Sequence, residues 1–411
     1  MNRRELLSGA SAALVAAGLV GPARAAFAAA SAQDAKAANT PVRVGVIGPG
    51  SRGKELIRQL LHVPGVEIAA VCDIYEPRFA QVNALVGHTV PATKDYRELL
   101  RRTDLDAIYV ATPVSLHAEH VLAALRSGRP VYGEKALAFT PEECQEVLHE
   151  ATQPDRIYQV GHEYRYASWV REAISQVQAG AVGEPTHVYA YWHRNNNWRR
   201  PVPNPSLEHL INWRLYRETS GGLVTELGSH QIDIANWVFG SQPTRVVGTE
   251  SIVKYHDGRT VGDNVQAVFN YSGGRRLVFS SLTDNAEVGN QLWIYGTEGS
   301  IQITIEDATM YYEPKAHHHA AANAEIVQNG ITTGASYSTK GEMPYRGPGK
   351  RLPVAIMEDP TLSACRAFIQ CVRTKEQAFA NAHVGFASAI ASSVANKATL
   401  LEEPQNIPQP V

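Results

Sequence analysis

The sequence predicts an α/β protein with two domains: an N-terminal doubly wound parallel sheet, and a C-terminal α/β domain built on a large, mostly antiparallel sheet. Three observations support this prediction. Short apolar strands alternate with helical patterns in the N-terminal half, and strand-like runs separated by turn signals follow in the second half. The length, 411 residues, is enough for two domains that each bury a core. We expect domains at residues 41–162 and 163–411, preceded by a separate segment, residues 1–40.

The composition excludes several classes of protein. The chain has 38 Lys and Arg residues against 40 Asp and Glu residues and is 44% hydrophobic, which excludes a disordered chain and a strongly basic nucleic-acid binder. Its four cysteines form no Cys-x-x-Cys pair and are too few for a disulfide framework. We therefore expect no nucleic-acid partner, and the cysteines predict no redox or zinc function.

Residues 1–40 have the features of an export signal. The pair Arg3-Arg4 precedes an apolar stretch from Gly9 to Gly21, and Ala23-Arg24-Ala25 offers a small-x-small cleavage site. This order predicts a twin-arginine signal and a periplasmic or otherwise exported protein. The apolar stretch is shorter than the roughly 20 residues that span a bilayer, so we expect no membrane anchor. A disordered cytoplasmic tail is the alternative.

A dinucleotide-binding pattern opens the first domain. The apolar run Val42–Ile47 predicts a buried strand, and it ends at a G-x-G-x-x-G sequence, Gly48 to Gly53. Helical spacing follows, and a second apolar run, Val66–Cys72, ends at Asp73. Glycines allow a tight turn against a pyrophosphate, and a helix N-terminus offers it free amides, whereas a structural glycine turn is the alternative. The Rossmann pattern thus predicts cofactor contacts from Gly48, Gly50, Ser51, Arg52, Gly53 and Asp73.

Asp73 favours NAD over NADP. Its carboxylate would accept hydrogen bonds from the ribose hydroxyls, whereas it would repel a 2′-phosphate by roughly 4 kcal/mol per charge pair at 4 Å. Arg52 and Arg78 lie close enough in the sequence to offset that repulsion, so NADP stays the alternative.

Three more apolar runs complete the first sheet. They are Ala107–Ala111, Val131–Gly133 and Ile157–Val160, and helical patterns separate them. Open α/β sheets bind their ligands at the carboxyl ends of the strands. The residues that follow these runs are therefore candidate site residues.

The segments after two of these runs resemble a known family. Thr112, Pro113 and His117, together with the segment Glu134-Lys135-Ala136, resemble the Gfo/Idh/MocA oxidoreductases, and the resemblance covers residues 42–400. It implies that Lys135 contacts the nicotinamide and the substrate, although Ala136 replaces the usual proline of the family. A surface lysine after a strand edge is the alternative. The cofactor contacts implied here are Thr112, Pro113, His117, Glu134 and Lys135.

A second family signature lies in Gly221–Asp233. This segment resembles G-x-x-x-D-x-x-x-H, with Glu226 in place of the aspartate and His230 as the histidine. Helical spacing would place Glu226, His230 and Asp233 on one face. The resemblance implies that His230 takes a hydroxyl proton while Lys135 steadies the alkoxide charge, roles that suit an imidazole and an ammonium group. A buried structural pair is the alternative, and we expect no metal because a third ligand is missing.

The second half contains six strand-like runs. They are Thr186–Trp192, Arg245–Val253, Asn264–Tyr271, Arg276–Ser281, Gln291–Tyr295 and Ser300–Ile305. In the family that the chain resembles, this sheet forms the substrate domain and often a dimer face, so we expect a homo-oligomer. Residues 313–358 are predicted as a long excursion, and His317-His318-His319 as an exposed polar loop within it. Helices are predicted near Leu362–Arg373 and His383–Leu401.

Indole, amide and guanidinium groups concentrate in Tyr191–Arg200 and Asn212–Arg214. Indole faces stack on the CH surfaces of sugars, and Asn and Arg donate to hydroxyl or carboxylate groups, so a sugar or polyol substrate fits. A loop that packs on a neighbouring subunit is the alternative. The expected substrate-binding residues are Tyr164, Arg165, Trp192, Arg194, Trp213, Arg214 and Asp233.

The sequence therefore predicts an NAD(P)-dependent oxidoreductase that acts on CH–OH groups of a sugar, polyol or sugar derivative. Its expected catalytic residues are Lys135, His230 and Glu226. Because nicotinamide cofactors are scarce outside the cytoplasm, we expect the cofactor to be held with nanomolar affinity or tighter, about −12 kcal/mol, and recycled on the protein. Two alternatives stay open: an NAD-dependent glycoside hydrolase that acts by transient oxidation and elimination, and a non-catalytic sugar-binding protein.

Overall fold

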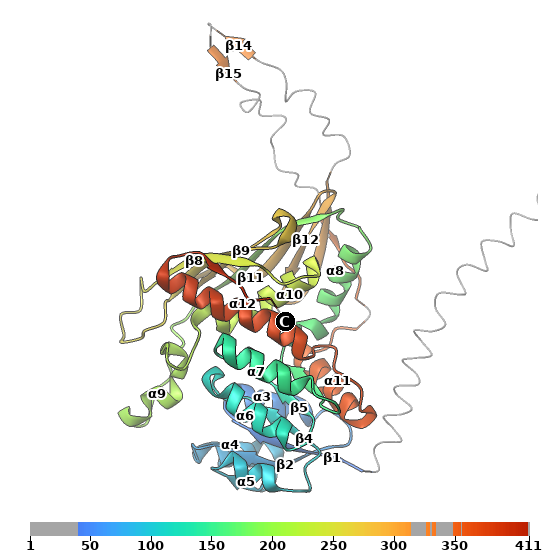
Figure 1. The fold of residues 1–411 in the computed structure, drawn as a ribbon, viewed down its shortest axis with the longest axis vertical. Helices are drawn as coiled ribbons and strands as arrows, with labels where there is room; N and C mark the ends of the chain where they lie inside the picture. Colours follow the sequence, from blue (N-terminus) through green and yellow to red (C-terminus); the bar gives the residue numbers. More distant parts are fainter. Residues whose placement is uncertain (1–39, 314–325, 329–330, 334–347, 355, 410–411) are drawn as a thin grey trace, which may run out of the picture.

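Two large sheets organise the chain (Figure 1). The fold is that of a computed structural model, which describes residues 40–313, 326–328, 331–333, 348–354 and 356–409. The predicted export signal and the triple histidine at 317–319 lie outside the described residues.

The first domain is a parallel sheet with the strand order β3-β2-β1-β4-β5-β6. This order confirms the predicted doubly wound sheet, because strands are added outward on both sides of the β1–β4 pair. The strands are β1 (Val42–Ile47), β2 (Val66–Cys72), β3 (Ala92–Thr93), β4 (Ala107–Val110), β5 (Val131–Gly133) and β6 (Tyr158–Val160). The helices are α3 (Ser51–Leu60), α4 (Pro77–Val86), α5 (Tyr96–Arg101), α6 (His117–Arg126) and α7 (Pro141–Ala151).

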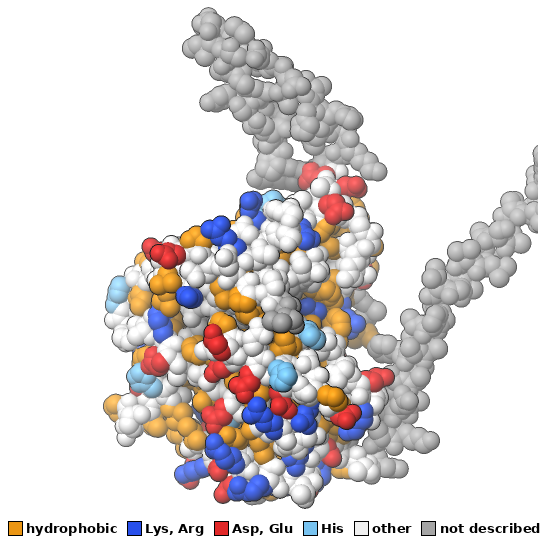
Figure 2. Space-filling view, in the orientation of Figure 1, with side chains coloured by type: hydrophobic (Ala, Val, Ile, Leu, Met, Phe, Trp, Pro, Cys, Tyr) orange, Lys and Arg blue, Asp and Glu red, His pale blue; other side chains and the backbone are white. Residues whose placement is uncertain are grey.

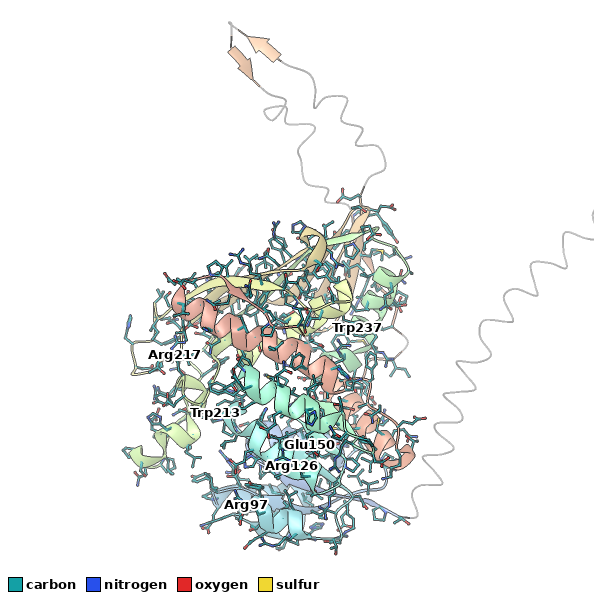
Figure 3. All side chains as sticks on the ribbon, viewed as in Figure 1. Arg97, Arg126, Glu150, Trp213, Arg217 and Trp237 are labelled. Carbon is teal, nitrogen blue, oxygen red and sulfur yellow. The ribbon has the colours of Figure 1, made fainter. Side chains whose placement is uncertain are left out.

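Local sequence explains these elements. β4 is buried along its whole length, as a central parallel strand requires, and α3 turns an apolar stripe toward the core. α7 begins at a capping box, in which the Thr140 hydroxyl accepts from the Glu143 amide at 3.2 Å and the Glu143 carboxylate accepts from the Thr140 amide at 3.0 Å. Figure 3 shows Arg126 of α6 beside Glu150 of α7, an ion pair at 3.3 Å that joins the two helices.

The second domain is a nine-stranded sheet with the order β16-β13-β12-β11-β7-β10-β9-β8-β17. Neighbouring strands are antiparallel except β7 and β10, which confirms the predicted mostly antiparallel sheet. The strands are β7 (Pro185–Asn195), β8 (Arg245–Ser251), β9 (Asn264–Asn270), β10 (Arg276–Leu282), β11 (Asp284–Gly296), β12 (Gly299–Thr304), β13 (Ala308–Tyr312), β16 (Lys350–Arg351) and β17 (Gln405–Asn406). A separate hairpin joins β14 (Ile326–Gln328) to β15 (Ile331–Thr333).

Helices cover one face of this second sheet. They are α8 (Ser168–Gln178), α10 (Ser229–Phe239) and α12 (Ala382–Leu401). Side chains alternate along β7, so that Val188 and Ala190 are buried while Tyr189 and Tyr191 lie partly exposed on the opposite face. Among the described residues, these helices leave the opposite face uncovered; we call it the uncovered face, and Tyr189 and Tyr191 lie on it.

The C-terminal helices also pack on the first domain, which the predicted boundary at residue 162 does not anticipate. α11 (Pro360–Thr374) contacts α3, and α12 contacts α7. Phe368 of α11 meets the rings of Tyr109 and Tyr132 edge-on, with centroids 5.3 and 5.8 Å away. In Figure 1, α12 runs along the junction of the two domains. This shared packing fixes the geometry between the domains.

After β7 the chain crosses back toward the first domain. This crossing segment, residues 196–216, contains η3 (Pro205–Leu207), α9 (Glu208–Ile211) and η4 (Trp213–Leu215). Arg200 donates from Nη1 to the Ser51 hydroxyl at 2.7 Å, at the start of α3. Arg200 and Asn212 also exchange two hydrogen bonds, of 2.7 and 3.0 Å, which brace the segment. Figure 3 shows Trp213 of this segment at the junction with the first domain.

The surface carries both signs of charge. On the face shown in Figure 2, acidic and basic side chains are interspersed, most densely over the first domain in the lower half. Such mixing weakens any long-range field on this face. Within the described part of the chain, no helix is both long enough and apolar enough to cross a bilayer.

Candidate active site

The loop between β1 and α3 is shaped to accept a pyrophosphate. Gly48 has a φ of +82°, and a Cβ added to Gly53 would lie 2.4 Å from the Gly48 carbonyl oxygen, so both positions require glycine. At Gly50, in contrast, the nearest atom to an added Cβ is 3.9 Å away, so the loop is open on that side. No side chain caps the start of α3, which leaves its amides available to an anion. These features fit the pyrophosphate of NAD.

A groove of about 170 Å³ runs beside this loop, and we call it the nucleotide groove. Its lining includes Gly48, Gly50, Ser51, Asp73, Thr112 and Pro113 from the first domain and Arg200, Ile211 and Trp213 from the crossing segment. The buried Asp73 carboxylate accepts two contacts from Arg78 Nη1, at 2.7 and 2.9 Å, and one from the Tyr75 amide at 2.9 Å. The predicted acid therefore lies at the groove, and Gly53 contributes through the loop's shape.

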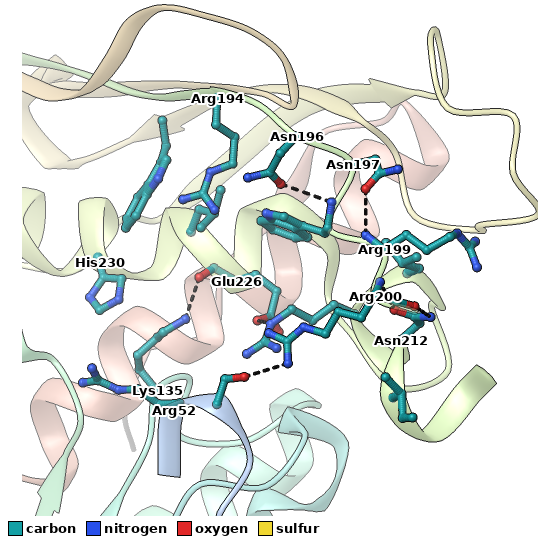
Figure 4. A pocket seen from close by; sticks show the side chains of 17 residues that line it. Arg52, Lys135, Arg194, Asn196, Asn197, Arg199, Arg200, Asn212, Glu226 and His230 are labelled. Atoms are coloured by element: carbon teal, nitrogen blue, oxygen red, sulfur yellow. Dashed lines mark hydrogen bonds and ion pairs between the residues drawn. The ribbon is translucent and has the colours of Figure 1, made fainter. Parts of the chain in front are cut away.

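A larger cavity of about 540 Å³, the main cavity, adjoins the groove (Figure 4). Both domains line it, through Ser51, Arg52, Lys135, Trp192, Arg194, Asn196, Asn197, Trp198, Arg199, Arg200, Ile211, Asn212, Arg214, Leu215, Glu226, Leu227 and His230. A connecting cavity of about 150 Å³ shares Arg52 and Arg214 with both of the others, and His117, Glu134 and Glu163 also line it. A cofactor in the groove would therefore adjoin a substrate in the main cavity.

Lys135 and His230 reach the main cavity from different domains. Lys135 follows β5 of the first domain, and His230 lies in the first turn of α10 in the second. Figure 4 shows both side chains directed into the cavity. Lys135 Nζ donates to the backbone carbonyl of Glu226 at 2.5 Å. This bond crosses the domain junction, and the ammonium group is near enough for its charge to act on the His230 imidazole.

His230 is held in its neutral form. It is only 4% exposed, and burial lowers its pKa well below the ordinary value of 6.5, while the nearby positive charge of Lys135 lowers it further. Its Nδ1 is buried and has no hydrogen-bond partner among the described residues. A neutral imidazole can accept a proton, as a general base must. The rings around it belong to His162, Tyr164 and Trp192, with centroids 5.6, 4.9 and 5.8 Å away.

Glu226 takes a different position from the one expected. It lies in a π-helical turn, Val224–Gly228, so the spacing that would align Glu226, His230 and Asp233 on one α-helical face does not apply. The Glu226 carboxylate accepts from Arg214 Nε at 2.9 Å, and its backbone carbonyl holds Lys135. Its side chain thus fixes Arg214 at the cavity wall.

Three predicted substrate-binding residues, Tyr164, Arg165 and Asp233, do not line the main cavity, which corrects the sequence expectation. Arg165 Nε donates to both carboxylate oxygens of Asp233, at 2.8 and 3.0 Å, and both side chains are buried. The two charges compensate each other within the fold, and neither side chain lines the groove or the cavities. Tyr164 instead packs edge-on against His230 and supports its orientation. The other predicted substrate residues, Trp192, Arg194, Trp213 and Arg214, all line the groove or the cavities.

The side chains of His117 and Glu134 form hydrogen bonds that hold the segments after the strands β4 and β5. The ring nitrogens of His117 lie 2.6 Å from the Ala136 carbonyl and 2.9 Å from the Thr112 carbonyl, which ties together the segments after β4 and β5. Burial lowers the pKa of His117, and these two hydrogen bonds oppose the change. Glu134 accepts from Arg52 Nε at 2.7 Å. These bonds position the backbone that carries Lys135.

Two family profiles match the chain. One, described as "Oxidoreductase family, NAD-binding Rossmann fold", matches residues 42–162, and the other, described as "GFO/IDH/MocA C-terminal domain", matches residues 170–302. The chain belongs to the GFO/IDH/MocA oxidoreductase family. Its first domain is accordingly an NAD-binding Rossmann domain, as predicted from the glycine pattern and Asp73.

The chain is similar to proteins that are named as dehydrogenases and to others that are named as glycosidases. Inositol 2-dehydrogenase 3 of Saccharopolyspora erythraea is 41% identical over 157 residues, which cover 38% of this chain and 45% of the relative. Alpha-N-acetylgalactosaminidase of Shewanella oneidensis is 30% identical over 189 residues, covering 43% and 40%. A solved structure of levoglucosan dehydrogenase with NADH and levoglucosan has the same fold, with a TM-score of 0.71 at 20% identity, covering 90% of this chain and 100% of that one.

Glu163 and Arg200 are site residues that the sequence did not single out. Glu163 lies 3.5 Å from Arg52 Nη2 and 3.9 Å from His230 Nε2, and burial raises the pKa of its carboxyl group. Only folding brings the segment after β6 beside α10, so no local pattern marks Glu163. Arg200 belongs to the predicted polar run, but its contact with Ser51 depends on the path of the crossing segment.

The pH dependence of turnover tests the state of His230 in this family member. Because burial lowers the pKa of His230 below 6.5, the group stays neutral and active until the pH falls well below that value. We expect the acidic fall in kcat/KM to lie entirely below pH 6.5. His230→Asn should lower turnover by roughly 100-fold or more. The exposed His88→Asn should leave the profile unchanged. A fall centred at or above pH 6.5 contradicts this description.

Proposed function

We propose that the protein oxidises a CH–OH group of a sugar, polyol or sugar derivative, with NAD as its redox cofactor. The observation that carries this proposal is the meeting of Lys135 and His230 in one cavity beside the nucleotide groove. The names of its relatives support the substrate class, since an inositol dehydrogenase and a levoglucosan dehydrogenase are among them.

Each residue has a distinct task in this reaction. NAD, when bound, supplies the hydride acceptor. Neutral His230 takes the proton of the substrate hydroxyl, while Lys135 donates to the same oxygen and stabilises the negative charge that grows on it. The carbon loses its hydrogen as a hydride and the hydroxyl oxygen loses its proton, so the CH–OH group becomes a carbonyl. Arg214, fixed by Glu226, closes the cavity wall and helps to exclude water.

Substitution of Lys135 tests these roles. Lys135→Met should reduce sugar or polyol oxidation by roughly 100-fold or more, because the oxyanion loses its charged donor. The bound dinucleotide should remain, because the glycine loop and the crossing segment are unchanged. Lys397→Met, on the exposed side of α12, is the matched control and should keep full activity. Equal activity in both variants would contradict the proposed role.

An NAD-dependent glycoside hydrolase is the second candidate. Its supporting observation is the partial similarity to the alpha-N-acetylgalactosaminidase of Shewanella oneidensis. Such a reaction oxidises a ring carbon, eliminates the glycosidic group, adds water and returns the hydride, so the cofactor shows no net change. The panel of substrates should therefore include aryl glycosides. Aglycone release without net sugar oxidation would reject the first proposal in favour of this one.

We also propose that the cofactor is retained on the protein during export. The crossing segment covers part of the nucleotide groove with Arg200, Ile211 and Trp213, and the Arg200–Ser51 bond holds it against α3. A cofactor beneath this segment could leave only after the segment moved. Retention is needed if the twin-arginine sequence at Arg3-Arg4 delivers the folded protein to a compartment that lacks free NAD.

Cell fractionation tests export and retention together. The parent should be recovered from the periplasm with NAD identified by mass spectrometry, whereas the double variant Arg3→Lys, Arg4→Lys should stay in the cytoplasm. Arg200→Ala should be exported but should lose most of its NAD during dialysis, because the segment is no longer held on Ser51. Parent protein found only in the cytoplasm, or exported without a nucleotide, would overturn this proposal.

We propose that the uncovered face of the nine-stranded sheet pairs with a second copy of the chain. Partly exposed rings pack together there: Trp293 lies 5.9 Å from Tyr295 and 5.4 Å from Tyr311, and Tyr295 lies 5.6 Å from Tyr189. Flat aromatic surfaces of this kind are favoured at the centres of interfaces.

Sedimentation velocity checks the proposed pairing. The parent should sediment as a dimer or a larger assembly at micromolar concentration, and Trp293→Glu should shift it to the monomer, because a charge would be buried without a partner. Leu401→Glu, on an exposed site of α12, controls for a general effect of added charge. A monomeric parent would exclude the interface.

A further inference from the structure

The charges around the main cavity are unbalanced. Among the described residues, Glu226 provides the one carboxylate that lines it. Six cationic side chains line it, those of Arg52, Lys135, Arg194, Arg199, Arg200 and Arg214. Carboxylates within the fold pair with three of these cations: Glu134 with Arg52, Glu208 and Asp257 with Arg199, and Glu226 with Arg214. Three cations, Lys135, Arg194 and Arg200, have no carboxylate partner within the residues that the structure describes.

Two of the three unpaired cations already have a hydrogen-bond partner. Lys135 is held by the Glu226 carbonyl beside His230, and Arg200 is held by the Ser51 hydroxyl at the edge of the nucleotide groove. The side chain of Arg194 makes no hydrogen bond or ion pair with any described part of the chain. Among the described cations of the cavity, the Arg194 guanidinium group is therefore the one whose donors are all unused.

Aromatic rings hold Arg194 in place without neutralising it. Its guanidinium carbon lies 5.5 Å from the ring centre of Trp192 and 5.4 Å from that of Trp198. Figure 4 shows the side chain reaching from the end of β7 into the cavity. Burial and the nearby positive charge of Arg214 both lower the pKa of Arg194, which means that its charge is poorly solvated. An anionic ligand would supply the missing counter-charge.

The position of Arg194 relative to the reacting groups sets the size of this ligand. The Trp192 ring lies 5.5 Å from the Arg194 guanidinium carbon and 5.8 Å from the His230 ring. One small molecule could therefore contact Arg194 with one end and His230 with the other. Asn196 and Asn197 also line the cavity, and their amide oxygens accept from backbone amides at 3.1 and 3.0 Å, which leaves their NH₂ groups for hydroxyls.

We propose that Arg194 binds a carboxylate of the substrate, so that the substrate is an acidic sugar: a uronic acid, an aldonic acid or a glycoside of one. The oxidation of such a substrate rests on the proposed function, whereas the binding of its carboxylate by Arg194 does not. A guanidinium fork between two indoles matches a planar carboxylate in a bidentate arrangement. A phosphate ester is the other anion to be tested. We favour the carboxylate because one guanidinium group provides fewer donors than the three phosphate oxygens need.

Binding to the NAD-loaded protein, measured by calorimetry, tests the inference without any need for turnover. The probes are D-glucuronate, D-galacturonate and D-gluconate, with D-glucose and D-galactose as neutral partners and glucose 6-phosphate as the phosphate arm. At least one acid should bind about 10- to 100-fold more tightly than its neutral partner, the range expected for hydrogen bonds to a charged group. Neutral sugars that bind as tightly as every acid, no binding of any acid, or preference for the phosphate ester would overturn it.

Variants assign the preference to Arg194. In Arg194→Gln the ratio of acid affinity to neutral affinity should fall to about one, and Arg194→Lys should restore part of it, because charge returns without the planar fork. Arg276→Gln, on the exposed side of β10, is the control and should keep the ratio of the parent. A ratio unchanged in Arg194→Gln would assign the preference elsewhere. Acid binding through Arg194 without oxidation of any acid, sugar or polyol would contradict the proposed function and leave the binding role of Arg194 intact.

Discussion

The hydrogen bond from the Lys135 ammonium group to the Glu226 carbonyl is the constraint on which the site depends. It joins the end of β5 in the first domain to the π-helical turn that leads into α10 in the second. Lys135 comes with the sheet that carries the glycine loop, and His230 comes with the sheet that carries the aromatic cavity wall. Without a fixed junction these two groups could not act on one oxygen, because a displacement of about 1 Å can lower a rate by two orders of magnitude.

Packing elsewhere keeps this junction rigid. α11 inserts Phe368 against Tyr109 and Tyr132, and α12 contacts both α7 and the strand β8. The crossing segment adds a contact on the opposite side of the groove, where Arg200 meets Ser51. The domains are thus joined around the site, and the cofactor groove is formed partly by residues of the second domain. Close-packed side chains resist compression, so a shift of one domain against the other would strain this packing.

The local patterns of the sequence were sufficient for the glycine loop and for the strands of the first domain except the two-residue edge strand β3. Gly48, Gly50, Gly53 and Asp73 follow one another along a single β-α-β unit, so their spacing fixes their arrangement. Lys135 was singled out because it follows a predicted strand and because the segment Glu134-Lys135-Ala136 resembles a family motif. Contacts between distant segments were not predictable in this way. The pairing of Arg165 with Asp233 is one example.

The proximity of Glu163 to His230 and the return of α11 to the first domain also depend on tertiary packing. The π-helical turn at Glu226 could not be read from residue spacing either, because the i, i+4 rule assumes an α-helix. The sequence therefore singled out Lys135 and His230, which line one cavity, but not Glu163, which lies beside His230.

The central claim is that a retained dinucleotide reacts beside Lys135 and His230. Transfer of deuterium from the substrate to the nicotinamide tests this claim most directly. The protein, purified with its own cofactor, would be mixed with sugars and sugar acids deuterated at their carbinol carbons, and the bound nucleotide would be analysed by mass spectrometry after one turnover. The account predicts deuterium on the nicotinamide of the parent and a much slower transfer in Lys135→Met. A parent that carries the dinucleotide and never acquires deuterium from any of these substrates would contradict it.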